Sequence, residues 1–227
     1  MRLLVVNPNC TATMTAKIGA AARAAAALGT EILALDPGEG PVSIEGYVDK
    51  AFAVPGMLRA IREAERDGSD AHVIACFDDT GLDAARALAD APVIGIGEAA
   101  FHMASLIAGR FSVVTTLSRS VPAIEANLVR YGLAARCARV RASEVPVLAL
   151  EEPGSGAEAI VLGCAGMADL AARLADRHGL PVLDGVACAV KLAESLHALG
   201  LRTSKLGGYA RPGPKIYRGR FANDAPT

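Results

Sequence analysis

Two cysteines, Cys76 and Cys164, stand at corresponding points in the two halves of the 227-residue sequence. Each ends a short apolar run and is followed by a glycine-containing turn and an Ala/Leu-rich helical stretch. A new apolar run then opens 16 or 17 residues further on, at Pro92 or Pro181. Open α/β sheets bind ligands where strands end and helices begin. Two such ends from related halves can place one thiol on each side of a substrate.

Two facing thiols can exchange protons at a single carbon. A thiolate at a strand-to-helix turn is favoured by the positive end of the helix dipole, which is expected to lower its pKa from about 8.5 towards neutrality. The thiolate can remove an acidic C–H proton, and a thiol on the opposite face can return a proton to the same carbon. The product has the inverted configuration, and the two thiols need no cofactor for this chemistry.

The alternative role for a cysteine after a strand is that of a small buried apolar residue. The matching positions of Cys76 and Cys164 favour the catalytic interpretation over this one. Cys137 and Cys188 lack the duplication and are expected in the core. Cys10 lies in the first turn, where it can border a pocket without acting.

Polar residues near the expected strand ends are candidates for binding the substrate. Asn9 follows the first apolar run and offers amide donor and acceptor groups, although an Asn beside Pro8 also forms turns. Thr115, Thr116 and Ser118 hold the equivalent place in the second half. They can bond a ring carbonyl or N–H, with helix capping as the alternative.

Three further features are compatible with a pocket but also with ordinary structural roles. Gly95 and Gly97 would allow close backbone approach with amides aimed at a developing enolate oxygen, or form a tight turn. Asp78 and Asp79 either hold the loop beneath the first cysteine or form a solvated turn. Tyr47 either covers the pocket or packs on the surface. The four histidines are scattered, without the HxxxH or CxxC spacing of a metal site, so none is expected.

Short apolar runs alternate with Ala-rich helical stretches, which favours parallel sheets with helices on both faces. The expected strands are 3–6, 31–35, 72–75, 93–96, 112–115, 138–141, 147–150, 160–163 and 181–183. The expected helices are 13–27, 54–67, 81–89, 98–107, 119–131, 167–177 and 187–198.

The two halves repeat this pattern with a period of about a hundred residues, which indicates two lobes. The first is expected to cover residues 1–97, completed by a C-terminal helix at about 187–227, and the second residues 98–186. The predicted fold class is therefore α/β, with two pseudo-symmetric lobes. Each lobe is a mostly parallel sheet flanked by helices, with the active site between them.

The connection between the expected strands 147–150 and 160–163 is too short for the crossover that parallel neighbours need. We infer that roughly 15 to 20 residues, mostly one crossover helix, are missing near 153–156. A true deletion and an antiparallel connection are the alternatives.

Composition excludes several classes of partner. The chain is 52% hydrophobic, enough for a sizeable core, and its net charge of −1 gives no reason to expect a nucleic acid or an anionic membrane. The first apolar run is too short for a signal peptide, and an odd number of five cysteines indicates reduced thiols, so a cytoplasmic protein is expected. The Gly-, Pro- and Arg-rich tail is either solvated or an arm that packs on a neighbouring subunit.

Taken in order, the motifs resemble the hydantoin racemase family, within the aspartate/glutamate racemase superfamily. The segments that carry this likeness are Asn7–Asn9, Ser43–Tyr47, Ala75–Asp79, Pro92–Glu98, Gly163–Met167, Asp184–Val186 and Thr203–Lys205 with Tyr209. The resemblance implies a two-lobed α/β fold, a pocket between the lobes, racemisation by two cysteines without a cofactor, and homo-oligomers.

The sequence therefore predicts a racemase of 5-substituted hydantoins or of the related ureide allantoin, with Cys76 and Cys164 as catalytic residues. Both substrates carry an acidic C–H between a ring carbonyl and a ring nitrogen. The alternatives are an aspartate or glutamate racemase, another isomerase of the superfamily, and a non-catalytic two-lobed ligand-binding protein. The predicted substrate-binding residues are Asn9, Tyr47, Phe77, Gly97, Thr115, Thr116, Ser118, Ala165 and Gly166.

Because the thiols alone supply base and acid, racemase activity should survive exhaustive EDTA treatment. The purified protein should also show no absorbance from bound pyridoxal. The measurement is the racemisation rate before and after chelation. Activity lost on chelation and restored by a metal ion would mean that the sequence holds a ligand set not recognised above.

Overall fold

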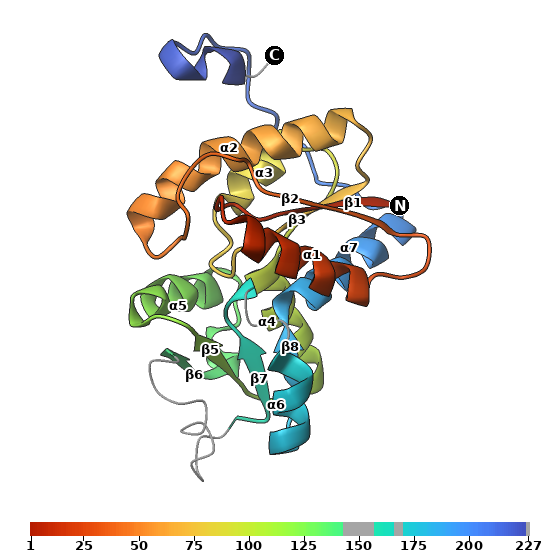
Figure 1. Ribbon diagram of the computed structural model, residues 1–227, viewed down its shortest axis with the longest axis vertical. Coiled ribbons are helices and arrows are strands. Elements are labelled where there is room, and N and C mark those ends of the chain that lie inside the picture. Colours follow the sequence, from red (N-terminus) through yellow and green to blue (C-terminus); the bar gives the residue numbers. More distant parts are fainter. Residues whose placement is uncertain (143–156, 166–169, 226–227) are drawn as a thin grey trace.

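The computed structural model describes residues 1–142, 157–165 and 170–225, which form two parallel four-stranded sheets (Figure 1). The first sheet has the order β2-β1-β3-β4, and the second has the order β6-β5-β7-β8. The α/β architecture of two parallel sheets confirms the predicted fold class. The strands are β1 (Arg2–Val6), β2 (Glu31–Leu35), β3 (Ala71–Ile74), β4 (Val93–Gly95), β5 (Phe111–Thr115), β6 (Cys137–Ala142), β7 (Ala159–Leu162) and β8 (Val182–Asp184).

The helices connect these strands close to the expected positions. One boundary is wrong: the helix expected at 54–67 begins seven residues earlier, at Tyr47, and continues through Pro55. Of the helices in the described ranges, none has both the length and the apolar character needed to cross a membrane. The helices are α1 (Ala12–Ala25), α2 (Tyr47–Arg66), α3 (Leu82–Leu88), α4 (Ile96–Ile107), α5 (Val121–Arg130), α6 (Ala171–His178) and α7 (Gly185–Ala198), with short 3-10 turns η1 (Ser118–Ser120), η2 (Ala134–Arg136), η5 (Gly207–Tyr209) and η6 (Gly219–Asp224).

Three expectations concern residues outside the described ranges. They are the strand at 147–150, the missing crossover near 153–156 and the start of the helix at 167–177. The strand expected at 160–163 is β7, which runs parallel to β5 on the side opposite β6.

Strand register brings the expected site segments together within each lobe. In the first sheet Val6 at the end of β1 pairs with Ile74 at the end of β3. In the second sheet Val114 of β5 pairs with Leu162 of β7. Because neighbouring parallel strands end at the same edge, the segment after β1 emerges beside the one that carries Cys76, and the segments after β5 and β7 emerge together.

One apolar cluster extends through both lobes, so the two sheets share a core. It includes residues of β1, β3, α4, β5, β7 and α7. Figure 1 shows α1, α4 and α7 between the two sheets, and α7 contacts α1, α4, β3, β4 and β8. At the start of α7, a Cβ on Gly185 would lie 2.7 Å from the Ile96 carbonyl oxygen, so only glycine allows this approach. Where one lobe ends and the other begins stays a prediction.

His72 is an unusual part of this core. Its side chain on β3 is fully buried, and neither ring nitrogen has a hydrogen-bond partner. Burial disfavours the charged form and lowers the pKa of His72 to about 4. The unfolded chain, with a His pKa of about 6.5, therefore binds more protons than the folded protein between pH 6.5 and pH 4.

We expect the His72→Leu variant to lose less stability on acidification than the wild type. Between pH 7 and pH 5, the difference in unfolding free energy between the two proteins should shift by about 2 kcal/mol in favour of the variant. The measurement is urea denaturation followed by circular dichroism at both pH values. His102→Leu, which removes an exposed histidine, is the control and should show no such shift. An equal pH dependence of the unfolding free energy in wild type and His72→Leu would contradict the lowered pKa of His72.

Candidate active site

The two cysteines line one cavity of about 230 Å³. Its walls come from the segments that follow β1, β3, β5 and β7, together with the loop before α2 and the start of α5. A larger cavity of about 370 Å³ lies between α2, α3 and the C-terminal segment, but it is mostly apolar and contains neither cysteine. The residues that line the smaller cavity are Asn9, Met14, Ser43, Ile44, Glu45, Ala75, Cys76, Phe77, Asp78, Thr115, Thr116, Leu117, Ser120, Ile124, Gly163, Cys164 and Ala165.

Five of the predicted substrate-binding residues border this cavity: Asn9, Phe77, Thr115, Thr116 and Ala165. Several of them also hold the wall itself. The side-chain oxygen of Asn9 accepts from the Thr11 amide at 3.0 Å, so Asn9 also forms the turn named as its alternative. Thr115 donates to the Gly163 carbonyl at 3.2 Å, and the Phe77 ring packs edge-on against Phe101. These side chains therefore fix the cavity's shape as well as border it.

Two other predicted residues, Tyr47 and Ser118, do not line the cavity. Tyr47 begins α2 with a 70% exposed side chain, and its ring lies near the Lys50 ammonium group. Ser118 begins η1 and is not among the lining residues. Gly166 lies outside the described residues.

The predicted role of Gly97 is corrected by its surroundings. Its N–H donates to the Asp79 carboxylate at 3.0 Å, so this amide does not face the cavity. A Cβ at this position would lie 2.2 Å from the Phe77 carbonyl oxygen, and one on Gly95 would lie 2.1 Å from Asp79 Oδ1. Another part of the molecule does come close to both glycines, as expected, but it is the loop that follows β3 and not a substrate.

Sequence reasoning did not select the wall formed by Ser43, Ile44 and Glu45 as part of the site. This loop precedes α2, and the Ser43 hydroxyl donates to Glu45 Oε1 at 3.0 Å. The Cys10 amide fixes the start of the loop by donating to the Pro41 carbonyl at 3.0 Å. The available signal was the Ser43–Tyr47 motif, which carries the family resemblance but has no periodicity that would indicate a pocket.

Cys76 is held by hydrogen bonds within its own turn. Its Sγ–H donates to Asp78 Oδ1 at 2.8 Å, and the Thr80 hydroxyl donates to the same oxygen at 2.9 Å. The Lys50 ammonium group lies 2.9 Å from Asp78 Oδ2. Burial, and then the nearby Asp78 charge, raise the pKa of Cys76 well above its ordinary value. The expected lowering of the pKa is wrong for Cys76, because the thiol is buried and in contact with the Asp78 carboxylate, whereas α3 begins only at Leu82.

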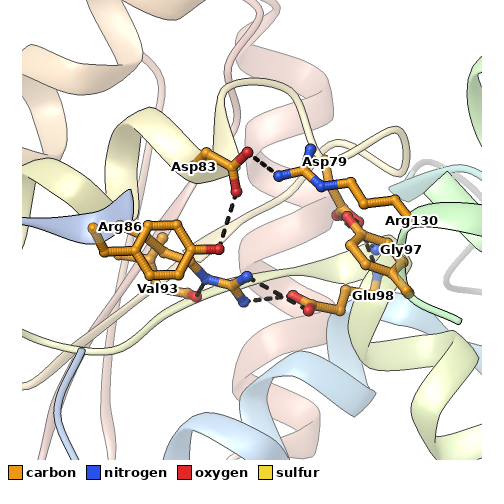
Figure 2. Close-up of polar contacts among 9 residues, drawn as sticks. Asp79, Asp83, Arg86, Val93, Gly97, Glu98 and Arg130 are labelled. Atoms are coloured by element: carbon orange, nitrogen blue, oxygen red, sulfur yellow. Dashed lines mark hydrogen bonds and ion pairs between the residues drawn. The ribbon is translucent and has the colours of Figure 1, made fainter. Parts of the chain in front are cut away.

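Asp79, the next residue, does not line the cavity and anchors the turn through its polar contacts (Figure 2). It is buried, adopts a left-handed φ of 50°, and accepts from the amides of Gly97 at 3.0 Å and Glu98 at 2.8 Å. The Tyr131 hydroxyl, at the end of α5, donates to it at 2.7 Å. Burial raises the pKa of Asp79 to about 7, although these donors oppose the shift. Asp79 therefore does not belong to a solvated turn. Its carboxylate joins the Cys76 loop to the second lobe.

Further contacts tie the Cys76 loop and α3 to α5. The Asn127 side chain donates to the Asp78 carbonyl at 2.9 Å. Arg130 pairs with Asp83 of α3, which also accepts from the Tyr209 hydroxyl at 3.1 Å (Figure 2). The two lobes are thus connected directly behind the first cysteine.

Close backbone contact positions the second cysteine. The Gly163 amide donates to the Val114 carbonyl at 2.6 Å. A Cβ on Gly163 would lie 2.9 Å from that same oxygen, so a larger residue would push the ends of β5 and β7 apart. Gly163 therefore sets the position at which Cys164 enters the cavity.

The described residues that line the cavity include no cation. Its ionisable groups are Glu45, Asp78 and the two thiols. In the described part of the chain, no three His, Cys, Asp or Glu side chains are grouped so that they could hold a metal ion. The chemistry available here is proton transfer by thiols beside hydrogen-bonding hydroxyl and amide groups.

Comparison with known proteins gives a consistent result. The family model for "Asp/Glu/Hydantoin racemase" matches residues 3–155 and 149–193. A hydantoin racemase from Rhizobium meliloti is 49% identical, over 96% of this chain and 98% of its own length. Another, from Pseudomonas sp. (strain NS671), is 43% identical over 98% and 96%. The structure of an allantoin racemase from Klebsiella pneumoniae superposes with a TM-score of 0.92, at 50% identity over 98% of each chain.

Removing the Asp79 carboxylate should destabilise the protein, because two buried amides and the Tyr131 hydroxyl lose their acceptor. We expect Asp79→Ala to lower the unfolding free energy by about 2–4 kcal/mol, and Tyr131→Phe, which removes one donor, by about 1 kcal/mol. Since the chain has no Trp, unfolding in urea is followed by circular dichroism. Equal, small losses in both variants would show that the carboxylate does not anchor the turn.

Proposed function

The chain belongs to the Asp/Glu/Hydantoin racemase family, and we propose that it racemises 5-substituted hydantoins or allantoin by proton transfer between two cysteines. The observation that carries this proposal is the shared cavity, which Cys76 and Cys164 enter from different sheets. That the protein is an isomerase of the racemase type follows from its family and its relatives.

In the proposed reaction, the thiolate of one cysteine removes the C5 proton of the ring. The electron pair of the broken C–H bond moves into the adjacent carbonyl and forms an enolate. The thiol of the other cysteine then donates its proton to the opposite face of C5, and its sulfur becomes the thiolate. The hydroxyl of Thr116 and the amide of Asn9, which border the cavity, are the proposed donors to the developing negative charge.

The charges of the cavity favour a neutral ring over a free amino acid. Aspartate and glutamate would bring one or two carboxylates into a cavity whose described lining holds Glu45 and Asp78 but no Lys, Arg or His. Recognition of a carboxylate normally uses charge-assisted bonds from cationic side chains. A hydantoin or ureide instead presents N–H groups, and these acidic side chains can accept hydrogen bonds from them. Its carbonyl oxygens can accept from hydroxyl and amide groups.

The proposal is tested by incubating the protein in D2O with enantiopure 5-substituted hydantoins, with allantoin, and separately with aspartate and glutamate. Optical rotation should decay to zero for the ring compounds, with deuterium appearing at C5. Racemisation of aspartate or glutamate alone would overturn the substrate assignment. Binding of the rings without loss of rotation would instead support a ligand-binding protein.

Replacing either cavity thiol should abolish racemisation, because a serine hydroxyl is a far weaker base at neutral pH. We expect Cys76→Ser and Cys164→Ser each to lower the racemisation rate by roughly 10²–10⁴-fold or more. Cys10→Ser is the matched control, since Cys10 does not line the cavity, and it should keep near wild-type activity. Full activity in either of the first two variants would refute the two-thiol mechanism.

A further inference from the structure

A carboxylate lies in direct contact with one of the two cavity thiols, although proton exchange between two thiols does not itself require one. Asp78 Oδ1 accepts the Cys76 Sγ–H bond at 2.8 Å, and the side chain of Asp78 is only 13% exposed. Lys50 of α2 and the hydroxyl of Thr80 fix both of its oxygens. Asp78 is therefore held in place, and its contact with Cys76 is not that of a mobile surface side chain.

This contact discriminates between the two protonation states of the thiol. The thiol can donate a hydrogen bond to the carboxylate, whereas the thiolate cannot donate and would be repelled by it. The surroundings of Cys76 add to this preference. The other charged or titratable groups that face it are Glu45 and Cys164 in the shared cavity, with Lys50 reaching it only through Asp78.

We propose that Asp78 keeps Cys76 in the thiol form in the free enzyme, so that Cys76 enters the reaction as the proton donor and Cys164 as the proton acceptor. This inference rests on the proposed two-thiol function and adds a direction to it. Burial of Cys76, which also raises its pKa, acts in the same sense.

The proton transfers balance over one turnover. The Cys164 thiolate takes the C5 proton, and Cys76 breaks its S–H bond to give a proton to the opposite face of C5. The enzyme then holds a Cys164 thiol and a Cys76 thiolate beside Asp78. Repulsion by Asp78 makes this thiolate a strong base, so that it regains a proton from solvent after product leaves, while Cys164 releases one.

Alkylation of Cys76 tests the inference without measuring racemisation. The full-length Cys164→Ser protein is used, because no adduct on the second thiol can then block the cavity. Iodoacetamide modification of Cys76 is followed by peptide mass spectrometry between pH 6 and pH 10. Adding Asp78→Asn, which keeps the side-chain size but removes the charge, should speed alkylation at pH 8 by about tenfold, since loss of a like charge lowers the thiol pKa and raises the thiolate fraction.

Two further variants keep this experiment decisive. Lys50→Gln removes the cation that compensates Asp78, so it should slow alkylation of Cys76, opposite in direction to Asp78→Asn. Asp83→Asn makes the same charge change in α3, where the carboxylate pairs with Arg130 and Tyr209, and should leave the rate unchanged. An Asp78→Asn rate equal to that of the parent protein would overturn the inference.

Deuterium exchange gives the matching catalytic readout. With Cys164 as the resting base, Cys76→Ser should still exchange the C5 proton of one enantiomer in D2O. Cys164→Ser should exchange neither enantiomer at pH 7 until Asp78→Asn is added, which frees Cys76 to ionise. Equal exchange by both single cysteine variants would contradict the direction assigned here. A change in alkylation without any racemisation in the wild type would instead leave the role of Asp78 standing and refute the proposed function.

Discussion

The site depends on one buried carboxylate, that of Asp79. A carboxylate inside a protein needs hydrogen-bond donors on most of its lone pairs, and here two come from the amides that open α4 and one from Tyr131 at the end of α5. Because the Asp79 carboxylate must accept from these three donors, the position of the turn after β3 against the second lobe is fixed. The same turn carries Cys76, so the geometry of the cavity wall follows from the needs of a residue that is not in the cavity.

The adjacent residues Asp78 and Asp79 thus have different roles, because their side chains lie in different surroundings. Asp79 points into the interface between the lobes, where burial raises its pKa to about 7. Asp78 points into the cavity, where it touches the Cys76 thiol and the Lys50 ammonium group. His72 is buried on β3, the strand that leads into this turn, and burial lowers its pKa to about 4. Between pH 4 and pH 6.5, Asp79 makes the folded state less stable as the pH rises and His72 makes it more stable, so their effects oppose each other.

The sequence predicted the parts of this site that follow from periodicity and strand ends. Alternating apolar runs and helical stretches specify two parallel sheets, and parallel neighbours ending together bring Asn9 beside the Cys76 turn. It could not predict contacts between distant side chains: Tyr131 lies 52 residues from Asp79, and no local pattern links them. The role of Gly97 was misread for the same reason, because a glycine that admits a ligand and one that admits a neighbouring loop look alike in a sequence.

The two lobes repeat the same arrangement, yet a racemase in which both thiols were equivalent would have no defined resting state. Repetition of the strand-and-turn pattern brings the two sulfurs to one cavity from different sheets. What the repetition cannot supply is a difference between them, and that must come from side chains that the halves do not share. In the sequence Asp78 is such a residue, because the second position after Cys164 is Gly166 where the second position after Cys76 is Asp78. If Asp78 acts as proposed, the two lobes provide two opposed proton carriers, and the Asp78 carboxylate decides which of them begins as the acid.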